Sequence, residues 1–311
     1  MKKFKSKKGA ILWILIIIIL LLDIYIFFDL RYQKQRYLDS NKENLQVLAN
    51  EKAMQVNSFL EAQKEKLFVL NTINVFKEAV MNPGDIVKIE EANKTINELK
   101  SIIPGISILT NEGIAVVGEF DLLGTDYSQH PYFVRKDKNI SFERYYDPLR
   151  KEDYYAIIGP IYDNTNKSKI IGRLAFDIEL SKISALMKET LEDNKTNEIY
   201  LIDETGLLLS YSKYIGQENK KGVLIQEVKS NGAKVCLDDL KKYEKNGIVE
   251  KHEEEVIQYT NYMGDNVFGA HAYVPEIMGC IIAEQNANKI TNFLITDPFK
   301  NIFKKEVKDE K

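Results

Sequence analysis

The chain has 311 residues, of which 44% are hydrophobic and 29% are charged, and its formal net charge is −3. This balance is typical of folded domains and excludes a disordered chain, and the absence of a strong positive charge argues against nucleic acid as a partner. Two cysteines, Cys236 and Cys280, leave two alternatives open: a disulfide, or two small buried side chains. The sequence contains no Cys/His cluster, so no metal or cofactor site is expected.

Residues 10–28, AILWILIIIILLLDIYIFF, form a predicted transmembrane anchor, because about 20 apolar residues span a hydrocarbon core of about 30 Å. A cleaved signal peptide is the alternative, but its apolar region would be shorter, and no small-residue cleavage site follows. Lysines crowd the preceding tail, residues 1–9, and this asymmetry predicts a single-pass protein of the cell inner membrane with a cytoplasmic N-terminus. These are Lys2, Lys3, Lys5, Lys7 and Lys8.

Residues 30–81 are predicted to form one long stalk helix, because they lack Pro and Gly and carry apolar residues at spacings of three and four. Asn82, Pro83 and Gly84 end this helix, and a second helix is expected from a cap at Asp85. Polar residues interrupt the apolar stripe, namely Lys52, Gln55 and Lys66. The stalk is therefore expected to pack on its own domain along one part and to form a weak homodimer contact along another.

After Pro104 the pattern changes to strands separated by polar turns, which predicts an antiparallel sheet. The predicted strands are GISILT, IAVVGEF, ISFERYYDPL, DYYAIIGPIYD and KIIGRLAFDI. With a closing helix at 179–192 they form a first α+β module, residues 85–192.

A similar order of elements recurs in residues 197–286 and predicts a second α+β module. Its predicted strands are EIYLID, LLLSYS, IVEKHEE, VIQYTNY, VFGAHAYV and GCIIAEQ. Residues 287–311 are expected to form a short helix and a charged tail, without a second span of 18 apolar residues. The sequence thus predicts an anchored protein without an output domain of its own, either half of an interrupted receptor or a subunit of a separate histidine kinase or chemoreceptor.

Two stretches resemble the membrane-distal module of the double Cache family of extracytoplasmic sensors: residues 124–163, GTDYSQHPYFVRKDKNISFERYYDPLRKEDYYAIIGPIYD, and residues 169–183, KIIGRLAFDIELSKI. EIYLIDETGLLLSYSKYIG and HAYVPEIMGCIIAEQN resemble its membrane-proximal module. The resemblance covers about residues 30–292. It implies two PAS-like modules on a long helix, usually in a dimer, with a small molecule bound in the distal module for signal transduction or chemotaxis.

The resemblance also implies which residues contact the ligand. Amino-acid-binding members of the family use an Arg, a Trp and a Tyr of a loop for the carboxylate, and a Tyr and an Asp on strands for the amine. Here the loop triplet is replaced by other side chains, and a histidine offers a carboxylate less than the permanent charge of arginine. The expected ligand is therefore an amine, or a zwitterion bound in another way. The expected contacts are His130, Tyr132, Phe133, Tyr145, Tyr146, Tyr155, Arg173 and Asp177.

Strand alternation qualifies this set. On KIIGRLAFDI, the face of Leu174 and Phe176 is apolar, so Arg173 and Asp177 share the opposite, ligand-facing side. Arg173 either replaces the missing arginine of the loop or is a solvated charge at the rim. His130 either contacts the ligand or caps a short helix. Of the pairs Tyr145-Tyr146 and Tyr154-Tyr155, one member each is expected to face the core.

Two other classes of function remain as alternatives. An enzyme is not expected, because the chain has no GxSxG, HExxH or P-loop motif and its three histidines are far apart. A structural or interaction stalk without a ligand is the second alternative, and the aromatic, Asp-bearing strands argue against it. In the second module, Tyr259 and Tyr262 are expected to pack in the sheet and are given no binding role.

Overall fold

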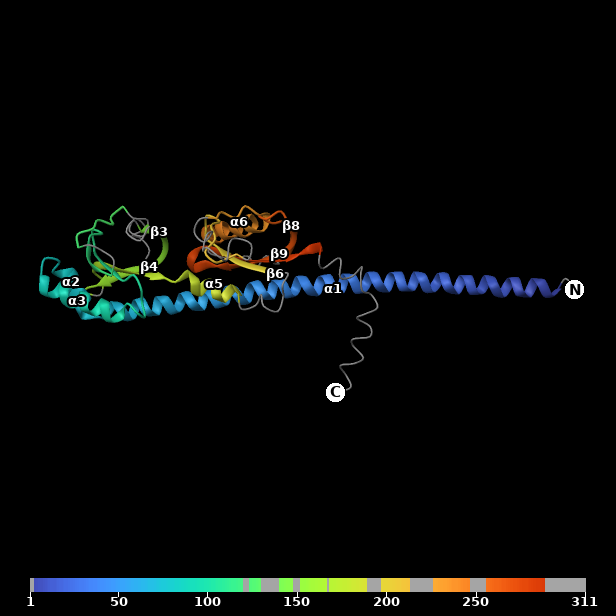
Figure 1. Ribbon diagram of the computed structural model, residues 1–311, viewed down its shortest axis with the longest axis horizontal. Coiled ribbons are helices and arrows are strands. Elements are labelled where there is room, and N and C mark those ends of the chain that lie inside the picture. The colour runs from blue at the N-terminus through green and yellow to red at the C-terminus, as the bar shows by residue number, and fades with distance from the viewer. Residues whose placement is uncertain are drawn as a thin grey trace, which may run out of the picture.

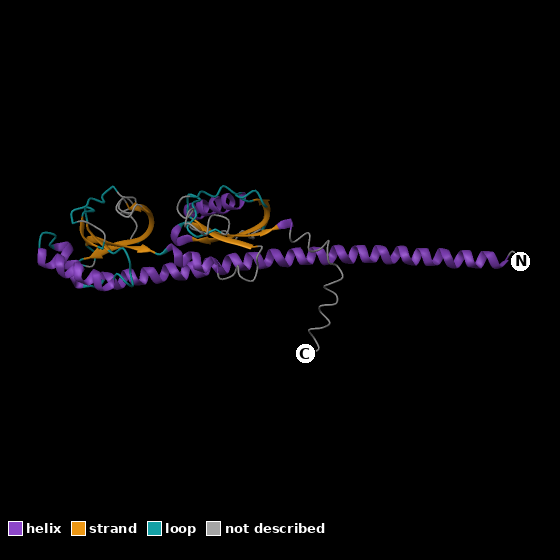
Figure 2. Cartoon of the chain, viewed as in Figure 1, coloured by secondary structure: helices purple, strands orange, loops and turns teal. Residues whose placement is uncertain are grey.

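The computed structural model describes residues 3–119, 123–129, 140–147, 152–166, 168–188, 197–212, 226–246 and 256–288. One long helix, α1 (Lys3–Asn71), extends along the molecule, and two modules lie one after the other along its C-terminal half (Figure 1). Each module contains an antiparallel sheet and helices (Figure 2). The chain is thus an α+β protein with a long N-terminal helix that carries two PAS-like modules.

The N-terminal half of α1 projects beyond both modules (Figure 1). Its large apolar side chains between Leu12 and Phe28 are 40% to 70% exposed. Within the described residues, α1 is the one helix that is long and apolar enough to cross a membrane. Such a continuous apolar surface is unfavourable in water and fits a bilayer.

The C-terminal half of α1 carries both modules on one stripe. Its buried apolar residues recur at helical spacing and belong to one core cluster shared with the two sheets. They include Leu45, Ala49, Val56, Leu60, Leu67 and Leu70. Lys52, which interrupts this stripe, is also buried, and its Nζ donates to the carbonyl oxygen of Leu186 at 2.6 Å. This polar residue therefore contacts a helix of its own chain.

The predicted single helix of residues 30–81 is divided in the structure. The long helix ends at Asn71, and a separate helix, α2 (Asn74–Met81), follows after an extended residue, Ile73. The hydroxyl of Thr72 donates to the carbonyl oxygen of Val69 at 2.7 Å and stabilises the turn. The break lets α2 bury Phe76 and its apolar neighbours under the first sheet.

The distal module contains α3 (Ile86–Leu99) and five strands. Asp85 caps α3 as predicted, because its side chain accepts from the backbone N–H of Val87 at 3.1 Å. The strands are β1 (Ser107–Thr110), β2 (Ala115–Gly118), β3 (Ser141–Asp147), β4 (Glu152–Tyr162) and β5 (Ile170–Ile178). Their order in the sheet is β2-β1-β5-β4-β3, and every pair is antiparallel. The central strand β5 therefore has neighbours on both sides.

The proximal module follows α5 (Leu180–Lys188) and has a four-stranded sheet in the order β6-β10-β9-β8. Its elements are β6 (Asn197–Ile202), α6 (Asn231–Asn246), β8 (Ile257–Thr260), β9 (Asn266–Val274), the 3₁₀ turn η1 (Pro275–Ile277) and β10 (Gly279–Asn286). The predicted strand LLLSYS is present only as isolated bridges, including Ile202 to Leu208. The predicted strand at 248–254 lies outside the described residues.

The two cysteines are bonded to each other. Cys236 of α6 and Cys280 of β10 form a disulfide inside a second core cluster, between the helix and the sheet. This outcome decides between the two alternatives that the sequence left open. The disulfide joins the helix to a central strand of the proximal sheet, and both cysteines are buried.

Candidate ligand-binding site

The distal sheet has one apolar face and one face with buried polar groups. Leu174 and Phe176 of β5 belong to the main core cluster that packs on α1. Arg173 and Asp177 of the same strand point to the other face and are only 4% and 6% exposed. The predicted alternation is confirmed. The alternative of a solvated Arg173 at the rim is wrong, because the neighbouring elements bury the side chain.

A second buried carboxylate lies on the same face as Asp177, two strands away. Ala156 of β4 pairs with Asp177 on one side and with Glu143 of β3 on the other. Residues opposite one another in antiparallel strands share a face, so Glu143 and Asp177 flank the small side chain of Ala156. Glu143 is 7% exposed. Strand alternation in FERYY places Glu143 on the face opposite to that of Phe142, and the register of β3 on β4 decides which face is that of Asp177.

A turn before β1 brings a third carboxylate to the same end of the strand. The backbone N–H of Asp177 donates to the carbonyl oxygen of Pro104 at 3.0 Å, and that of Gly105 donates to Oε2 of Glu119 at 2.8 Å. Gly105 has a φ of +67°, and a Cβ there would lie 2.1 Å from Oδ2 of Asp177. Only glycine fits this close approach. The end of the site near Asp177 is therefore acidic.

The middle of this face is apolar. Ala175 lies between Arg173 and Asp177 and belongs to a small buried cluster with Leu109, Ala115 and Ile158. Tyr127 packs against this cluster from the loop after β2. The face thus carries carboxylates at one end, a small apolar floor, and the guanidinium of Arg173 at the other end. Burial lowers the pKa of Arg173, and the nearby Tyr162 opposes this shift.

One of the two predicted tyrosine pairs, Tyr154 and Tyr155, can be compared with the strand register. Tyr155 is 3% exposed and belongs to the main core cluster. Its cross-strand partner is Ile178 and not Asp177, so its side chain lies on the side of α1. The prediction that Tyr155 faces the ligand with Asp177 is therefore wrong. Tyr154, two residues before Ala156, shares the face of Asp177 and is half-buried.

The remaining predicted contacts are less completely described. Tyr145 pairs with Tyr154 and Tyr146 pairs with Asp153 in the backbone ladder, and their side chains lie outside the described part of the structure. His130, Tyr132 and Phe133 lie outside the described residues. Among the residues that are described, no group of three or more His, Cys, Asp or Glu side chains is arranged to hold a metal ion.

The sequence was compared with models of known protein families. A model of the Cache domain matches residues 31–292, which include both modules and the C-terminal half of α1. The chain belongs to the Cache domain family. No curated protein sequence matches it significantly.

Solved structures share the fold of this Cache protein at low sequence identity. The sensor domain of the Vibrio cholerae histidine kinase DctB is 12% identical, with a TM-score of 0.58, over 82% of this chain and 98% of that one. The ligand-binding domain of the Campylobacter jejuni chemoreceptor Tlp3, in complex with L-valine, is 16% identical, with a TM-score of 0.56, over 84% and 98%. That of the Pseudomonas aeruginosa chemoreceptor PctC, in complex with GABA, is 14% identical, with a TM-score of 0.55, over 79% and 100%.

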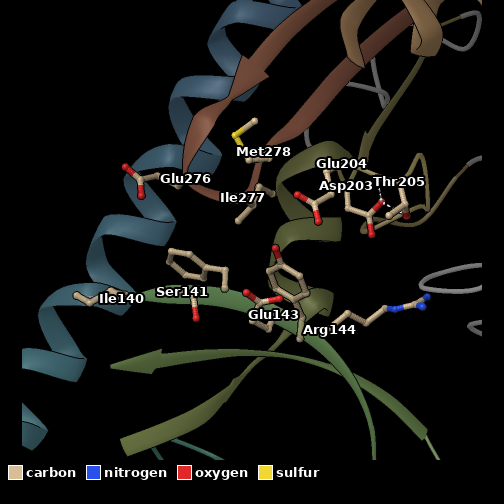
Figure 3. A pocket seen from close by; sticks show the side chains of 12 residues that line it. Ile140, Ser141, Glu143, Arg144, Asp203, Glu204, Thr205, Glu276, Ile277 and Met278 are labelled. Atoms are coloured by element: carbon tan, nitrogen blue, oxygen red, sulfur yellow. Dashed lines mark hydrogen bonds between the residues drawn. The ribbon is translucent and has the colours of Figure 1, made fainter. Parts of the chain in front are cut away.

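A cavity of about 270 Å³ lies where the two Cache modules meet (Figure 3). Ile140 and Arg144 come from the β3 side, and Glu276 and Met278 come from η1 and the residue after it. Four carboxylates line this cavity, those of Glu143, Asp203, Glu204 and Glu276. Glu276 forms an ion pair with Lys64 of α1, and Asp203 accepts from the backbone N–H of Thr205 at 2.8 Å. Two of these carboxylates thus hold groups of the protein itself, and Glu143 is shared with the polar face of the distal sheet, which is the candidate site.

The proximal Cache module contains a buried hydrogen-bond network around Glu284, which is 1% exposed. Its Oε1 accepts from the hydroxyls of Tyr200 at 2.8 Å and Tyr259 at 2.7 Å, and its Oε2 accepts from Nδ2 of Asn261 at 3.0 Å. Burial raises the pKa of Glu284, and these three hydrogen bonds oppose the shift. Tyr259 therefore has a polar partner in addition to its predicted role in packing.

The neighbouring carboxylate, Glu198, pairs with Glu284 across β6 and β10. It accepts from the hydroxyls of Ser212 and Tyr262, each at 2.5 Å. Two glycines, Gly232 and Gly269, make room for the ring of Tyr259, because a Cβ at either would lie 2.3 Å from its hydroxyl. The backbone of the proximal module thus leaves the space that the ring of Tyr259 needs to reach Glu284.

Proposed function

We propose that the chain is a membrane-anchored sensor that binds a small ammonium-bearing ligand on the polar face of its distal Cache module. The observation that carries the proposal is the buried pair Glu143 and Asp177, which flanks Ala156. An ammonium group offers such carboxylates both a positive charge and hydrogen-bond donors. Two structurally similar chemoreceptor domains are in complex with L-valine and with GABA, and both of these ligands carry such a group.

The membrane topology is part of the proposal. The exposed apolar half of α1 fits a bilayer, and the lysines that precede it favour a cytoplasmic N-terminus with both modules outside the inner membrane. A ligand in the extracytoplasmic space would then reach the distal module directly, and α1 would connect the occupied module to the membrane.

A homodimer along α1 also belongs to this proposal. Val47, Met54 and Phe68 are 59% to 70% exposed and lie on one side of the helix at spacings that are multiples of seven residues. Such a stripe favours packing against a second copy of the helix. Glu61 occupies the intervening position and is exposed, which keeps the contact weak.

The ligand class can be tested by isothermal titration calorimetry of the full chain in detergent micelles. The panel pairs ammonium compounds with analogues that lack the amine: L-valine with 3-methylbutanoate, and 4-aminobutyrate with butyrate. We expect binding by at least one ammonium compound and none by its amine-free analogue. Binding of the amine-free carboxylates alone would contradict the proposal.

A further inference from the structure

The candidate site of the distal module has two charged ends of opposite sign on one strand. Asp177 and Arg173 are four residues apart on β5, face the same side, and are both buried. At about 3.3 Å per residue, their Cα atoms are about 13 Å apart. Because both side chains rise from the same face of the sheet, the Cα separation sets the scale of the distance between the carboxylate and the guanidinium.

The surface between the two ends is small and apolar. Ala175, midway along this stretch of β5, pairs with Ile158 on β4 and with Ser107 on β1. Ala175 and Ile158 are buried with Leu109, and the phenol ring of Tyr127 packs beside them. An alkyl chain can lie on such a floor, whereas a charged group would be disfavoured there.

The spacing of the charges selects the length of the ligand. An ion-pair contact of about 3 Å at each end leaves about 7 Å between the ammonium nitrogen and the carboxyl carbon of a bridging molecule. In an α-amino acid these two atoms are only about 2.5 Å apart, because two bonds of about 1.5 Å separate them. An extended chain advances about 1.25 Å per bond, so five or six bonds match the distance.

We infer that this site takes a linear ω-amino acid of five or six carbons, with its ammonium group at Asp177, its methylene chain on Ala175 and Ile158, and its carboxylate at Arg173. The inference rests on the proposed function and names the ligand class of the same site. The planar guanidinium of Arg173 offers two parallel donors to a carboxylate. The positive charge of Arg173 repels the second ammonium group of a diamine. The site therefore distinguishes an ω-amino acid from a diamine by the group at the end of the chain that lies at Arg173.

The test is calorimetry of the full chain against a length series: glycine, 4-aminobutyrate, 5-aminopentanoate and 6-aminohexanoate, with butylamine and 1,5-diaminopentane. We expect affinity to rise at least tenfold from glycine to an optimum at 5-aminopentanoate or 6-aminohexanoate, and 1,5-diaminopentane to bind at least tenfold more weakly than 5-aminopentanoate. Arg173→Gln should weaken 5-aminopentanoate about 10- to 100-fold and leave butylamine unchanged. Lys169→Gln, an exposed position just before β5, is the matched control and should change neither.

The results separate this inference from the proposed function. Equal affinities of butylamine and 5-aminopentanoate, or an Arg173→Gln variant that loses both equally, would overturn the inference and leave an amine-binding site. Failure of all ammonium compounds to bind would overturn both. If Arg173→Gln does not fold by circular dichroism, Arg173→Lys keeps the charge without the planar fork, and it is expected to weaken 5-aminopentanoate and not butylamine. An unchanged ratio of the two affinities in that variant would overturn the inference.

Discussion

Replacement of Glu284 by alanine is expected to lower the free energy of unfolding by about 3 to 5 kcal/mol. The substitution removes the acceptor of three buried donors, the hydroxyls of Tyr200 and Tyr259 and the amide of Asn261. Each unsatisfied buried group costs about 1 to 3 kcal/mol. Chemical denaturation of the full chain in micelles, followed by far-ultraviolet circular dichroism, measures the change.

Two further variants define what Glu284 contributes. Glu227→Ala removes a half-exposed carboxylate that pairs with Lys229 at 2.9 Å, and should change the free energy of unfolding by less than about 1 kcal/mol. Glu284→Gln keeps an acceptor and removes the titration. Since burial raises the folded-state pKa of Glu284, its contribution is complete below its ordinary pKa of 4.5 and is lost as pH rises through the folded-state value. Stability of the wild type should therefore fall over that range, and that of Glu284→Gln should not.

Equal stabilities of Glu284→Ala and Glu227→Ala would contradict the assigned role of the network. A wild-type stability that rises with pH over the same range, relative to Glu284→Gln, would contradict the direction of the shift.

Loss of the disulfide between Cys236 and Cys280 is expected to destabilise the proximal module by up to about 4 kcal/mol. The two cysteines are 44 residues apart in the sequence, so the bond removes much of the chain entropy of the unfolded state. The experiment compares thermal unfolding of the wild type, with and without dithiothreitol, with that of a double variant, Cys236→Ala with Cys280→Ala.

Reductant should lower the unfolding temperature of the wild type and leave the double variant unchanged. This comparison separates the covalent bond from the loss of two buried side chains, because reduction retains both sulfur atoms. An unfolding temperature of the wild type that does not respond to reductant, under conditions where thiol titration shows full reduction, would contradict the expectation.

Much of the fold could be predicted because it follows from local patterns. The continuous helical spacing after residue 30 predicted α1, and alternation in KIIGRLAFDI separated Phe176 from Arg173 and Asp177 correctly. The break after Asn71 was missed, because no Pro or Gly marks it and the docking of α2 under the sheet causes it. Local signals end a helix only when they are stronger than tertiary packing.

The composition of the candidate site depends on the register between strands, which local sequence patterns do not specify. The adjacent tyrosine pairs left open which member shares the face of Asp177, and the register between β4 and β5 places Tyr155 on the side of α1. Alternation in FERYY places Glu143 on the face opposite to that of Phe142, but only the register of β3 on β4 shows that Glu143 shares the face of Asp177. The pairing of Glu198 with Glu284 joins residues far apart in the chain, and no local spacing predicts such a register.

The central claim is that the carboxylate of Asp177 holds the ammonium group of the ligand. Its most direct test is the affinity of Asp177→Asn for butylamine and 4-aminobutyrate, measured by calorimetry of the full chain beside Asp238→Asn, which alters a half-exposed carboxylate of α6. A charge-assisted hydrogen bond is worth about 1.5 to 3 kcal/mol, so Asp177→Asn should weaken binding roughly 10- to 150-fold, while Asp238→Asn should bind as the wild type does. If Asp177→Asn folds and binds both amines with unchanged affinity, the proposed site is wrong.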